Sequence, residues 1–250
     1  MPRDRPDILL FVTDDHAPWA LGCYGNSEVS SPMLDRLAGE GALCANAFTP
    51  CPVCSPARAS LMTGRTNSQV GIHDWIFQND PRYEHYDWLA DEITLPELLG
   101  REGYRCGLSG KWHLGETYKT PRGFAWYFGQ PGAPGAHRGN YTYVHDDRPL
   151  ALRGGHTELI TAHALDFLRR VPDDAPFFLV VGYVATHSPY TGQDPDLVAR
   201  YDRATFRDIP AYHPHPWHKN ESFPQGDAYA PEDIAIRHKN YYAAVTDIDR

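Results

Sequence analysis

The stretch DILLFVTDD at residues 7–15 is an apolar run that ends in two adjacent aspartates. A short continuous apolar run is typical of a strand buried in a parallel sheet, and we predict a strand at residues 7–13. Residues 105–109 and 177–183 are predicted to be further buried strands. Polar residues follow all three runs, and ligands bind parallel sheets at the carboxyl ends of the strands. A functional site is therefore expected at that edge.

Helix signals separate the predicted strands. Residues 32–40 follow Ser31, which we predict to be the helix cap, and Thr94 and Glu97 have the spacing of a capping box. Apolar residues recur at helical spacing over residues 157–170. Strands and helices thus alternate, which predicts an α/β fold with a largely parallel sheet.

Two stretches lack periodicity and are predicted to be loops over a pocket. Residues 129–139 are rich in Gly and Pro, and residues 209–230 mix Pro, His and aromatic residues. The last stretch, residues 231–250, has a helical pattern that still continues where the sequence stops. We therefore expect a fragment that ends before its domain does.

The composition limits the class of protein. The 250 residues are 42% hydrophobic, enough for one α/β domain that we expect to span residues 1–250, and their formal charge of -9 argues against general binding of nucleic acid. The apolar run at residues 8–12 is too short for a signal peptide or a membrane span. A cytoplasmic protein is expected as the chain is written, and a periplasmic or secreted one if a leader was removed. Five cysteines do not suggest a disulfide scaffold.

The sharpest local motif is CSPAR at residues 54–58, with Gly64 beyond it. Proline is favoured in the first turn of a helix, so Pro56 predicts Cys54 at a helix N-terminus, where free N–H groups and the helix dipole favour an anion. Arg58 adds a cation with bidentate donors one turn along the helix. Gly64 is expected to end the helix. This arrangement predicts a nucleophile in an anion-binding site.

The motif alone leaves other interpretations of Cys54 open. A small cysteine buried on a capped helix is one, because free cysteine is among the most buried residue types. Cys51 and Cys54 also have the C-x-x-C spacing of a dithiol redox motif. A cysteine phosphatase is disfavoured, because its arginine would lie farther from the cysteine than Arg58 does. Residues elsewhere in the chain are needed to choose between these interpretations of Cys54.

Polar residues at the other strand ends narrow the choice. Asp14 and Asp15 suit a hard divalent cation such as Ca²⁺ or Mg²⁺. Lys111 and His113 lie on one side of an extended segment, where they can hold an anion and move a proton. His187 follows the strand predicted at residues 177–183. Alone, each has an ordinary explanation as a solvated turn, a surface lysine or a structural histidine. Together they predict one catalytic pocket.

As an ordered set, longer segments resemble the type I, formylglycine-dependent sulfatases of the alkaline phosphatase superfamily over nearly the whole chain. The segments are PDILLFVTDD, SSPMLDRLAGEGALCANAFT, CSPARASLMTGR, GIHDW, TLPELLGREGYRCGLSGKWHLG, PFFLVVGYVATHSP and NYYAAVTDID. The resemblance implies an alkaline-phosphatase-like three-layer α/β/α sandwich with a mostly parallel sheet, incomplete at its C-terminal end. It also implies hydrolysis of an aryl or carbohydrate sulfate monoester to an alcohol and inorganic sulfate.

The resemblance further implies a metal and a modified residue. Asp14, Asp15 and Cys54 become ligands of a divalent cation, with Ca²⁺ expected before Mg²⁺. Cys54 becomes formylglycine, which requires a separate installing enzyme as a partner. The other expected partner is a small-molecule or glycan sulfate ester, and neither nucleic acid nor membrane is expected.

Catalytic roles follow from the same resemblance. Arg58 and Lys111 hold the oxygens of formylglycine and sulfate. His113 pairs with the formylglycine hydroxyl, which loses a proton to it when sulfate leaves. His187 faces the leaving group and protonates the departing alcohol. Cys54, Arg58, Lys111, His113 and His187 are thus the expected catalytic residues, and Lys111 and His187 the expected substrate contacts.

Several positions depart from the family pattern. Ala57 replaces a frequent serine, and an alanine and a threonine precede His187 where the family more often has proline before the histidine. The family's second pair of metal ligands and its second lysine are absent, and Asp247 and Asp249 are expected to be helix residues rather than ligands. Two alternatives therefore stay open, a phosphate or phosphonate ester hydrolase and a non-catalytic remnant.

Two further groups of residues are ambiguous. His213, His215 and His218 alternate with prolines and are expected to form a pocket-rim loop rather than a metal site. Three aromatic residues near predicted sheet ends could line the substrate pocket or belong to the core; they are Trp75, Trp112 and Tyr190.

Overall fold

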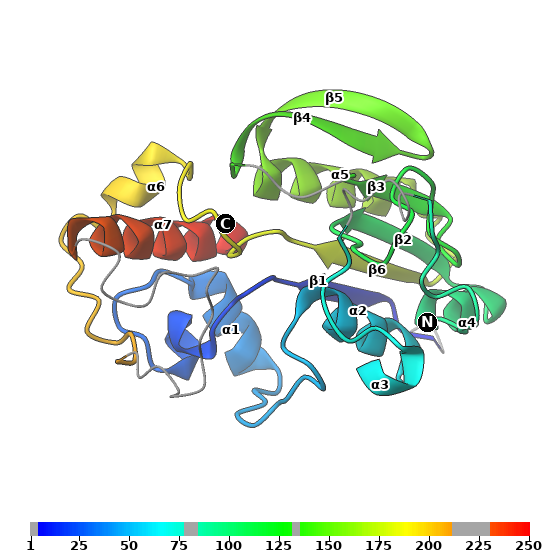
Figure 1. Cartoon of the computed structure of the whole chain (residues 1–250), viewed down its shortest axis with the longest axis horizontal. Helices are drawn as coiled ribbons and strands as arrows, with labels where there is room; N and C mark the ends of the chain where they lie inside the picture. Colours follow the sequence, from blue (N-terminus) through cyan, green and yellow to red (C-terminus); the bar gives the residue numbers. More distant parts are fainter. Residues whose placement is uncertain (1–4, 78–84, 132–135, 212–230) are drawn as a thin grey trace. The chain divides into compact units, whose positions relative to one another are not determined.

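A computed structural model describes residues 5–77, 85–131, 136–211 and 231–250 (Figure 1). The chain divides into two compact units. The sheet unit comprises Met1–Asp14 and Asn46–Val184, and the helix unit comprises Asp15–Ala45 and Ala185–Arg250. The prediction that residues 1–250 belong to one catalytic domain stays a prediction. The three histidines of residues 213–218 lie outside the described residues.

The sheet unit contains a six-stranded mixed sheet. Its strands are β1 (Ile8–Val12), β2 (Arg105–Gly110), β3 (Trp126–Gly129), β4 (Arg138–His145), β5 (Arg148–Gly155) and β6 (Phe177–Gly182). They are ordered β1-β6-β2-β3-β4-β5, with parallel pairing from β1 to β3 and antiparallel pairing from β3 to β5. The α/β class and the mostly parallel sheet are confirmed.

The hairpin of β4 and β5 corrects one expectation. Residues 129–139 were expected to be loop throughout, but β4 begins at Arg138. Strand β5 pairs with β4 along its whole length, and Asp146 and Asp147 form the two-residue turn with φ values of 46° and 65°. Pairing with a distant partner decides this strand, and the glycine-rich composition does not reveal it.

Helices of the sheet unit cover both faces of the sheet. They are α2 (Cys54–Thr63), α3 (Asn67–Val70), α4 (Leu95–Arg101) and α5 (His156–Arg170). Consecutive residues of β2 point to opposite faces. Leu108 packs in the core formed with Ala59 and Met62 of α2, whereas the Ser109 hydroxyl donates to the Ile160 carbonyl of α5 at 2.7 Å. The three-layer α/β/α sandwich is confirmed (Figure 1).

The helix unit is built around a long C-terminal helix. Its elements are the 3-10 helices η1 (Pro18–Ala20) and η2 (Gly22–Tyr24) and the α-helices α1 (Pro32–Glu40), α6 (Pro195–Ala199) and α7 (Pro231–Asp249). The helices predicted at residues 32–40 and 231–250 are thus confirmed. Among the described residues, no helix has both the length and the apolar character of a membrane span.

The cap of α1 differs from the prediction. Ser31 occupies the N-cap position, but its hydroxyl donates to Asp35 and does not cap the helix. The buried carboxylate of Asp249 instead accepts hydrogen bonds from Met33 N at 3.2 Å and Leu34 N at 2.7 Å. A carboxylate at a helix N-terminus satisfies free donors and complements the helix dipole. Asp249 therefore has a structural role in the helix unit.

We predict that Gly110→Ala destabilises the sheet unit strongly. Gly110 has φ +111°, and a Cβ atom there would lie 2.1 Å from the Gly182 carbonyl oxygen at the end of β6. Both strain and overlap oppose the substitution, so we expect about 3 kcal/mol or more of lost unfolding free energy in urea titrations. Gly100→Ala is the control: it lies in α4 with open space around it, and should stabilise by about 0.5–1 kcal/mol. Equal effects of the two substitutions would contradict the argument.

We predict that burial of His156 makes stability fall at acidic pH. His156 is 1% exposed, Tyr143 lies 2.5 Å from its Nδ1, and burial followed by the charge of His137 lowers its pKa to about 4. As the pH falls, His156 is therefore protonated near pH 6.5 in the unfolded chain but only near pH 4 in the folded chain. Stability is unaffected above that pH and falls from there toward pH 4.

The comparison with His156→Asn isolates this effect. Asn keeps an acceptor near Tyr143 but does not titrate, so between pH 7 and 4.5 the variant should lose about 1–3 kcal/mol less unfolding free energy than the unmodified protein. The same substitution at exposed His73 controls for the removal of a histidine. Parallel pH profiles for His156→Asn and the unmodified protein would refute the prediction.

Candidate active site

The centre of the candidate site in the sheet unit is the buried carboxylate of Asp14. Asp14 follows β1, is 6% exposed, and its Oδ2 accepts from Lys111 Nζ at 2.5 Å and from Arg58 Nη2 at 3.3 Å. The Cys54 thiol lies 3.5 Å from Oδ1 of the same carboxylate. Four predicted site residues from separate parts of the sequence are thus brought together.

The charges of this cluster do not cancel. Arg58 and Lys111 have side chains that are 8% exposed, and Asp14 is the one carboxylate that pairs with either among the described residues. Two cations face one anion, so the cluster carries a surplus positive charge in a region that water reaches poorly. Such a charge is most favourable when an anion binds beside it.

Hydrogen bonds to backbone carbonyls position the Arg58 guanidinium and the backbone of Lys111. Strands β2 and β6 are parallel neighbours that end together, and Lys111 N donates to the Gly182 carbonyl at 2.8 Å. Nη1 of Arg58 donates to the Lys111 carbonyl at 2.7 Å, while its Nη2 faces Asp14. The guanidinium therefore joins α2 to the ends of β1 and β2. Its planar donors suit this double role, which the point charge of a lysine would not fill.

Cys54 is the first residue of α2, as the position of Pro56 predicts. The free N–H groups of a helix's first turn and the helix dipole create a positive potential around such a residue. Gly64 ends the helix with φ 68°, which confirms the predicted C-cap. The thiol therefore lies where an anion or an attacking nucleophile is stabilised.

His113 is a buried histidine near the charges of Lys111, Arg58 and Asp14. It is 8% exposed, has φ 61°, and its Nε2 donates to the Ile76 carbonyl at 2.9 Å. Burial, followed by the nearby charge of Lys111, lowers its pKa to about 4. Because the carbonyl can only accept, the proton of the neutral ring sits on Nε2. Among the described residues Nδ1 has no hydrogen-bond partner, so its lone pair is available to a proton.

The helix unit holds Asp15 by its backbone. Asp15 has φ 53°, and its carbonyl oxygen accepts from Tyr241 Oη at 2.7 Å and from Thr186 Oγ1 at 3.0 Å. These two bonds fix the backbone of Asp15 and thereby the direction of its Cα–Cβ bond. Tyr241 and Thr186 were not predicted as site residues.

His187 is the predicted site residue that the helix unit brings to Asp15. Its Nε2 lies 3.8 Å from Asp15 Oδ2, and its Nδ1 donates to the Ser188 carbonyl at 2.7 Å. Its side chain is 27% exposed and that of Asp15 is 51% exposed. A partly exposed histidine with one ring nitrogen fixed by a carbonyl can exchange protons through the other.

The donor set suits a hard cation in type. Asp14 and Asp15 offer carboxylate oxygens, the ligands that Ca²⁺ and Mg²⁺ prefer. Two carboxylates are fewer than either ion takes in a full coordination shell. Within the described part of the chain, no group of three or more His, Cys, Asp or Glu could hold a metal ion. Carboxylates of this kind fit the expected metal in chemical type.

The ambiguous aromatic residues separate into three environments. Trp112 is 7% exposed and packs edge to face on Phe124 in the core, with ring centroids 5.9 Å apart. Trp75 is exposed in the sheet unit. Tyr190, in the helix unit, is half-buried near Tyr241. Of the three, Trp112 belongs to the core.

Comparisons with known proteins agree on one family. A family model described as "Sulfatase" matches residues 6–250. Human N-acetylgalactosamine-6-sulfatase is 33% identical over 219 residues, which are 77% of this chain and 41% of that protein. N-acetylglucosamine-6-O-sulfatase from Bacteroides thetaiotaomicron is 31% identical over 188 residues, 73% of this chain and 31% of the relative. The chain thus spans less than half the length of these curated relatives.

Solved structures agree with this result. A structure described as a complex with its substrate D-glucosamine-2-N,6-O-disulfate matches 80% of this chain and 38% of that one, with a TM-score of 0.70 and 27% identity. The phosphonate monoester hydrolase of Agrobacterium radiobacter matches 98% of this chain and 57% of that one, with a TM-score of 0.67 and 20% identity, which shows the shared fold. With a family model covering nearly all of its residues, the chain belongs to the sulfatase family.

Proposed function

We propose that this protein hydrolyses a sulfate monoester of a carbohydrate or aryl alcohol, with a nucleophile derived from Cys54. The observation that carries the proposal is the position of Cys54 at the start of α2, 3.5 Å from a buried carboxylate that two cations share. Membership of the sulfatase family supports the same reaction. The activity and substrate of the whole protein are proposals on these grounds.

The cations of the cluster suit the charge of a sulfate ester. Arg58 and Lys111 are held by the ends of β2 and β6 before any ligand binds. Donors that are already oriented stabilise the charge that develops on sulfate oxygens without having to reorganise. Lys111 and His187 are the proposed substrate contacts. Arg58 is assigned to both the nucleophile and the sulfate.

The proposed metal and modification complete this chemistry. A divalent cation, with Ca²⁺ expected before Mg²⁺, would be held by Asp14, Asp15 and the modified Cys54, and would supply Lewis-acid stabilisation of negative charge. Formylglycine at Cys54, made by a separate installing enzyme, would supply an oxygen nucleophile in place of the thiol. The oxygen donors of Asp14 and Asp15 and the helix-terminal position of Cys54 support both assignments.

Two histidines have properties that suit proton transfer. His113 is neutral near pH 7, and its Nδ1 lone pair can accept a proton while Nε2 stays bonded to Ile76. We assign it the removal of a proton from the modified Cys54 when sulfate leaves. His187 is assigned to the leaving alcohol, because a partly exposed imidazole can donate a proton to it.

Carbohydrate sulfate is the favoured substrate class. The names of two relatives specify 6-sulfates of N-acetylhexosamines, and these relatives are 33% and 31% identical to this chain. We therefore propose an O-sulfated N-acetylhexosamine as the substrate. Phosphate and phosphonate esters present a similar anion to the same cations. Comparing the turnover rates of a sulfate ester and a matching phosphate ester distinguishes the two substrate classes.

We predict that Cys54 is modified and indispensable. In a host that installs formylglycine, the mass of the tryptic peptide containing Cys54 should change as expected when CH₂SH becomes CHO. Compared with the unmodified protein from the same host, Cys54→Ala should lower sulfate release from a chromogenic aryl sulfate by roughly 10³-fold or more. The reason is that the substitution removes the nucleophile. Cys51→Ala should leave the rate near that of the unmodified protein.

The control at Cys51 separates the two interpretations of the C-x-x-C spacing. Equal loss of activity in Cys51→Ala and Cys54→Ala would favour a dithiol mechanism over the proposed one. An unmodified Cys54 thiol in the active protein would refute the formylglycine proposal. Faster turnover of the matching aryl phosphate than of the aryl sulfate would replace the sulfatase proposal with the phosphatase alternative.

We predict that Asp15 contributes to binding of Ca²⁺. Asp15→Asn removes a charged oxygen ligand, and calorimetric titration should show at least roughly tenfold weaker binding. The rise in melting temperature on adding Ca²⁺ should shrink accordingly, because a ligand stabilises the fold by mass action. Asp166→Asn on α5 is the matched control, since its carboxylate pairs with Arg170 on the surface. Unchanged Ca²⁺ affinity in Asp15→Asn would remove this residue from the proposed ligands.

A further inference from the structure

Two exposed aromatic rings form a pair in the sheet unit. Trp75 and Phe77 are 51% and 54% exposed, and their ring centroids lie 5.2 Å apart in an edge-to-face arrangement. Ile76 between them is 5% exposed and belongs to the core. Exposed and buried side chains therefore alternate over residues 75–77: the Ile76 side chain lies in the core, and the two rings are exposed. We call Trp75 and Phe77 the aromatic pair.

Both backbone groups of Ile76 are bonded to the candidate site. Its N–H donates to the Ser55 hydroxyl at 2.9 Å, and its carbonyl accepts from His113 Nε2 at 2.9 Å. Ser55 is the residue after Cys54, and consecutive Cα atoms are about 3.8 Å apart. Ile76, which lies between the two rings, is thus hydrogen-bonded to Ser55, the neighbour of the candidate nucleophile. It is also hydrogen-bonded to His113, the candidate base.

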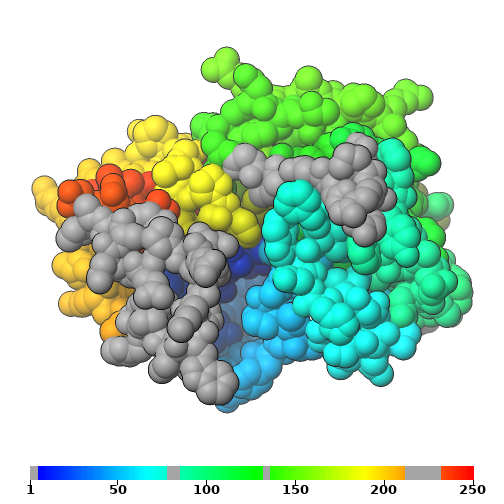
Figure 2. Space-filling model, viewed as in Figure 1, coloured from blue at the N-terminus to red at the C-terminus, as the bar shows by residue number. Residues whose placement is uncertain are grey.

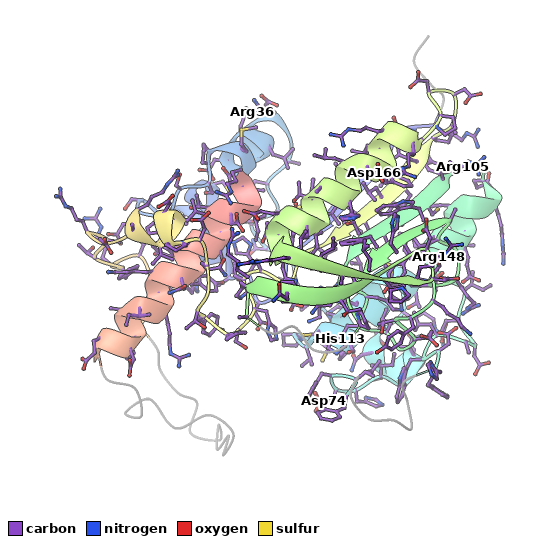
Figure 3. All side chains as sticks on the ribbon, turned by 90° about the horizontal axis from the view of Figure 1, so that it is seen from above. Arg36, Asp74, Arg105, His113, Arg148 and Asp166 are labelled. Carbon is purple, nitrogen blue, oxygen red and sulfur yellow. The ribbon has the colours of Figure 1, made fainter. Side chains whose placement is uncertain are left out.

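The figures agree with this placement within the sheet unit. Figure 3 shows Asp74 in the same region as His113 and on the other side of the unit from Asp166 of α5. In the space-filling view the cyan segment that includes the end of α2 and the residues after it lies at the surface (Figure 2). The exposed fractions of Trp75 and Phe77 leave both rings accessible to a ligand.

We propose that the aromatic pair is a platform on which a sugar ring of the substrate stacks. An exposed aromatic face is an electron-rich surface that attracts the C–H groups of a pyranose, and the two backbone hydrogen bonds of Ile76 fix the segment that carries both rings. The identity of this ligand rests on the proposed sulfatase function. The platform goes beyond that function, because it assigns recognition of the sugar ring to two residues outside the charged cluster of Asp14, Arg58 and Lys111.

Charge favours a sugar sulfate over an apolar partner. Arg58 and Lys111 form a cationic cluster in the same unit, with Asp14 as their shared carboxylate. A sulfated pyranose offers an anion for the cations and a C–H face for the rings, whereas an apolar protein surface offers the rings alone. Two rings are also a small patch for a stable protein interface, which buries on the order of 800 Å² on each partner.

Binding measurements on a Cys54→Ala background test the platform without turnover. The probes are an O-sulfated N-acetylhexosamine disaccharide and inorganic sulfate, titrated by calorimetry and followed by saturation-transfer NMR. Trp75→Ala and Phe77→Ala should each weaken disaccharide binding roughly 5- to 20-fold and remove transfer to the ring protons. Inorganic sulfate should bind all of these proteins equally, because the cations are untouched.

Two further variants make the test specific. Trp75→Phe keeps an aromatic face and should retain most of the affinity, which a loss caused by misfolding would not allow. Leu165→Ala, an equally exposed apolar residue on α5 across the sheet, should change nothing. Disaccharide affinity that survives both alanine substitutions would overturn the platform. Lack of inorganic sulfate binding, with disaccharide binding still dependent on Trp75, would instead count against the sulfatase proposal and leave the platform standing.

Discussion

The pairing of the Asp14 carboxylate with Lys111 and Arg58 is the interaction on which the site in the sheet unit depends. Three charges with little exposure persist only because each has an opposite charge and hydrogen bonds within reach. Their geometry in turn needs β1, β2 and β6 to end at one edge and α2 to begin there. The parallel sheet is therefore a condition for the charge cluster, since no single segment supplies more than one or two of its members.

This dependence explains which parts of the fold were readable from the sequence. The strands β1 and β6 are short apolar runs, and the helices α2, α4 and α5 have local caps or periodicity, so each of these elements can be predicted from a few neighbouring residues. Strands β3 to β5 cannot, because Arg138 and Gly139 join a strand only by pairing across a hairpin with residues 154 and 155. Local composition cannot report a partner that lies more than ten residues away.

The site divides in the same way. The clustering of Cys54, Arg58, Lys111 and Asp14 was predictable, because three of them lie at the end of a strand or the start of a helix and Arg58 follows one turn along that helix. Ile76 was not, because it acts through its backbone N–H and carbonyl, and any residue has those. Tyr241 was also missed: its hydroxyl reaches the carbonyl of a residue 226 positions earlier, and a tyrosine in a helix is ordinarily part of a core. Ser31 failed as a cap because Asp249, distant in sequence, provides a stronger acceptor.

The same reasoning changes how Cys54 is understood. On local sequence it was one cysteine among three defensible interpretations, and its helix position alone supports all of them equally. A buried structural cysteine, however, has no need of two cations around the carboxylate that it faces, and a dithiol pair has no need of a neutral histidine with a spare lone pair. Only an oxygen-anion chemistry uses both features together. The surroundings of Cys54, more than the motif that contains it, therefore support the proposal that this site acts on an anionic ester.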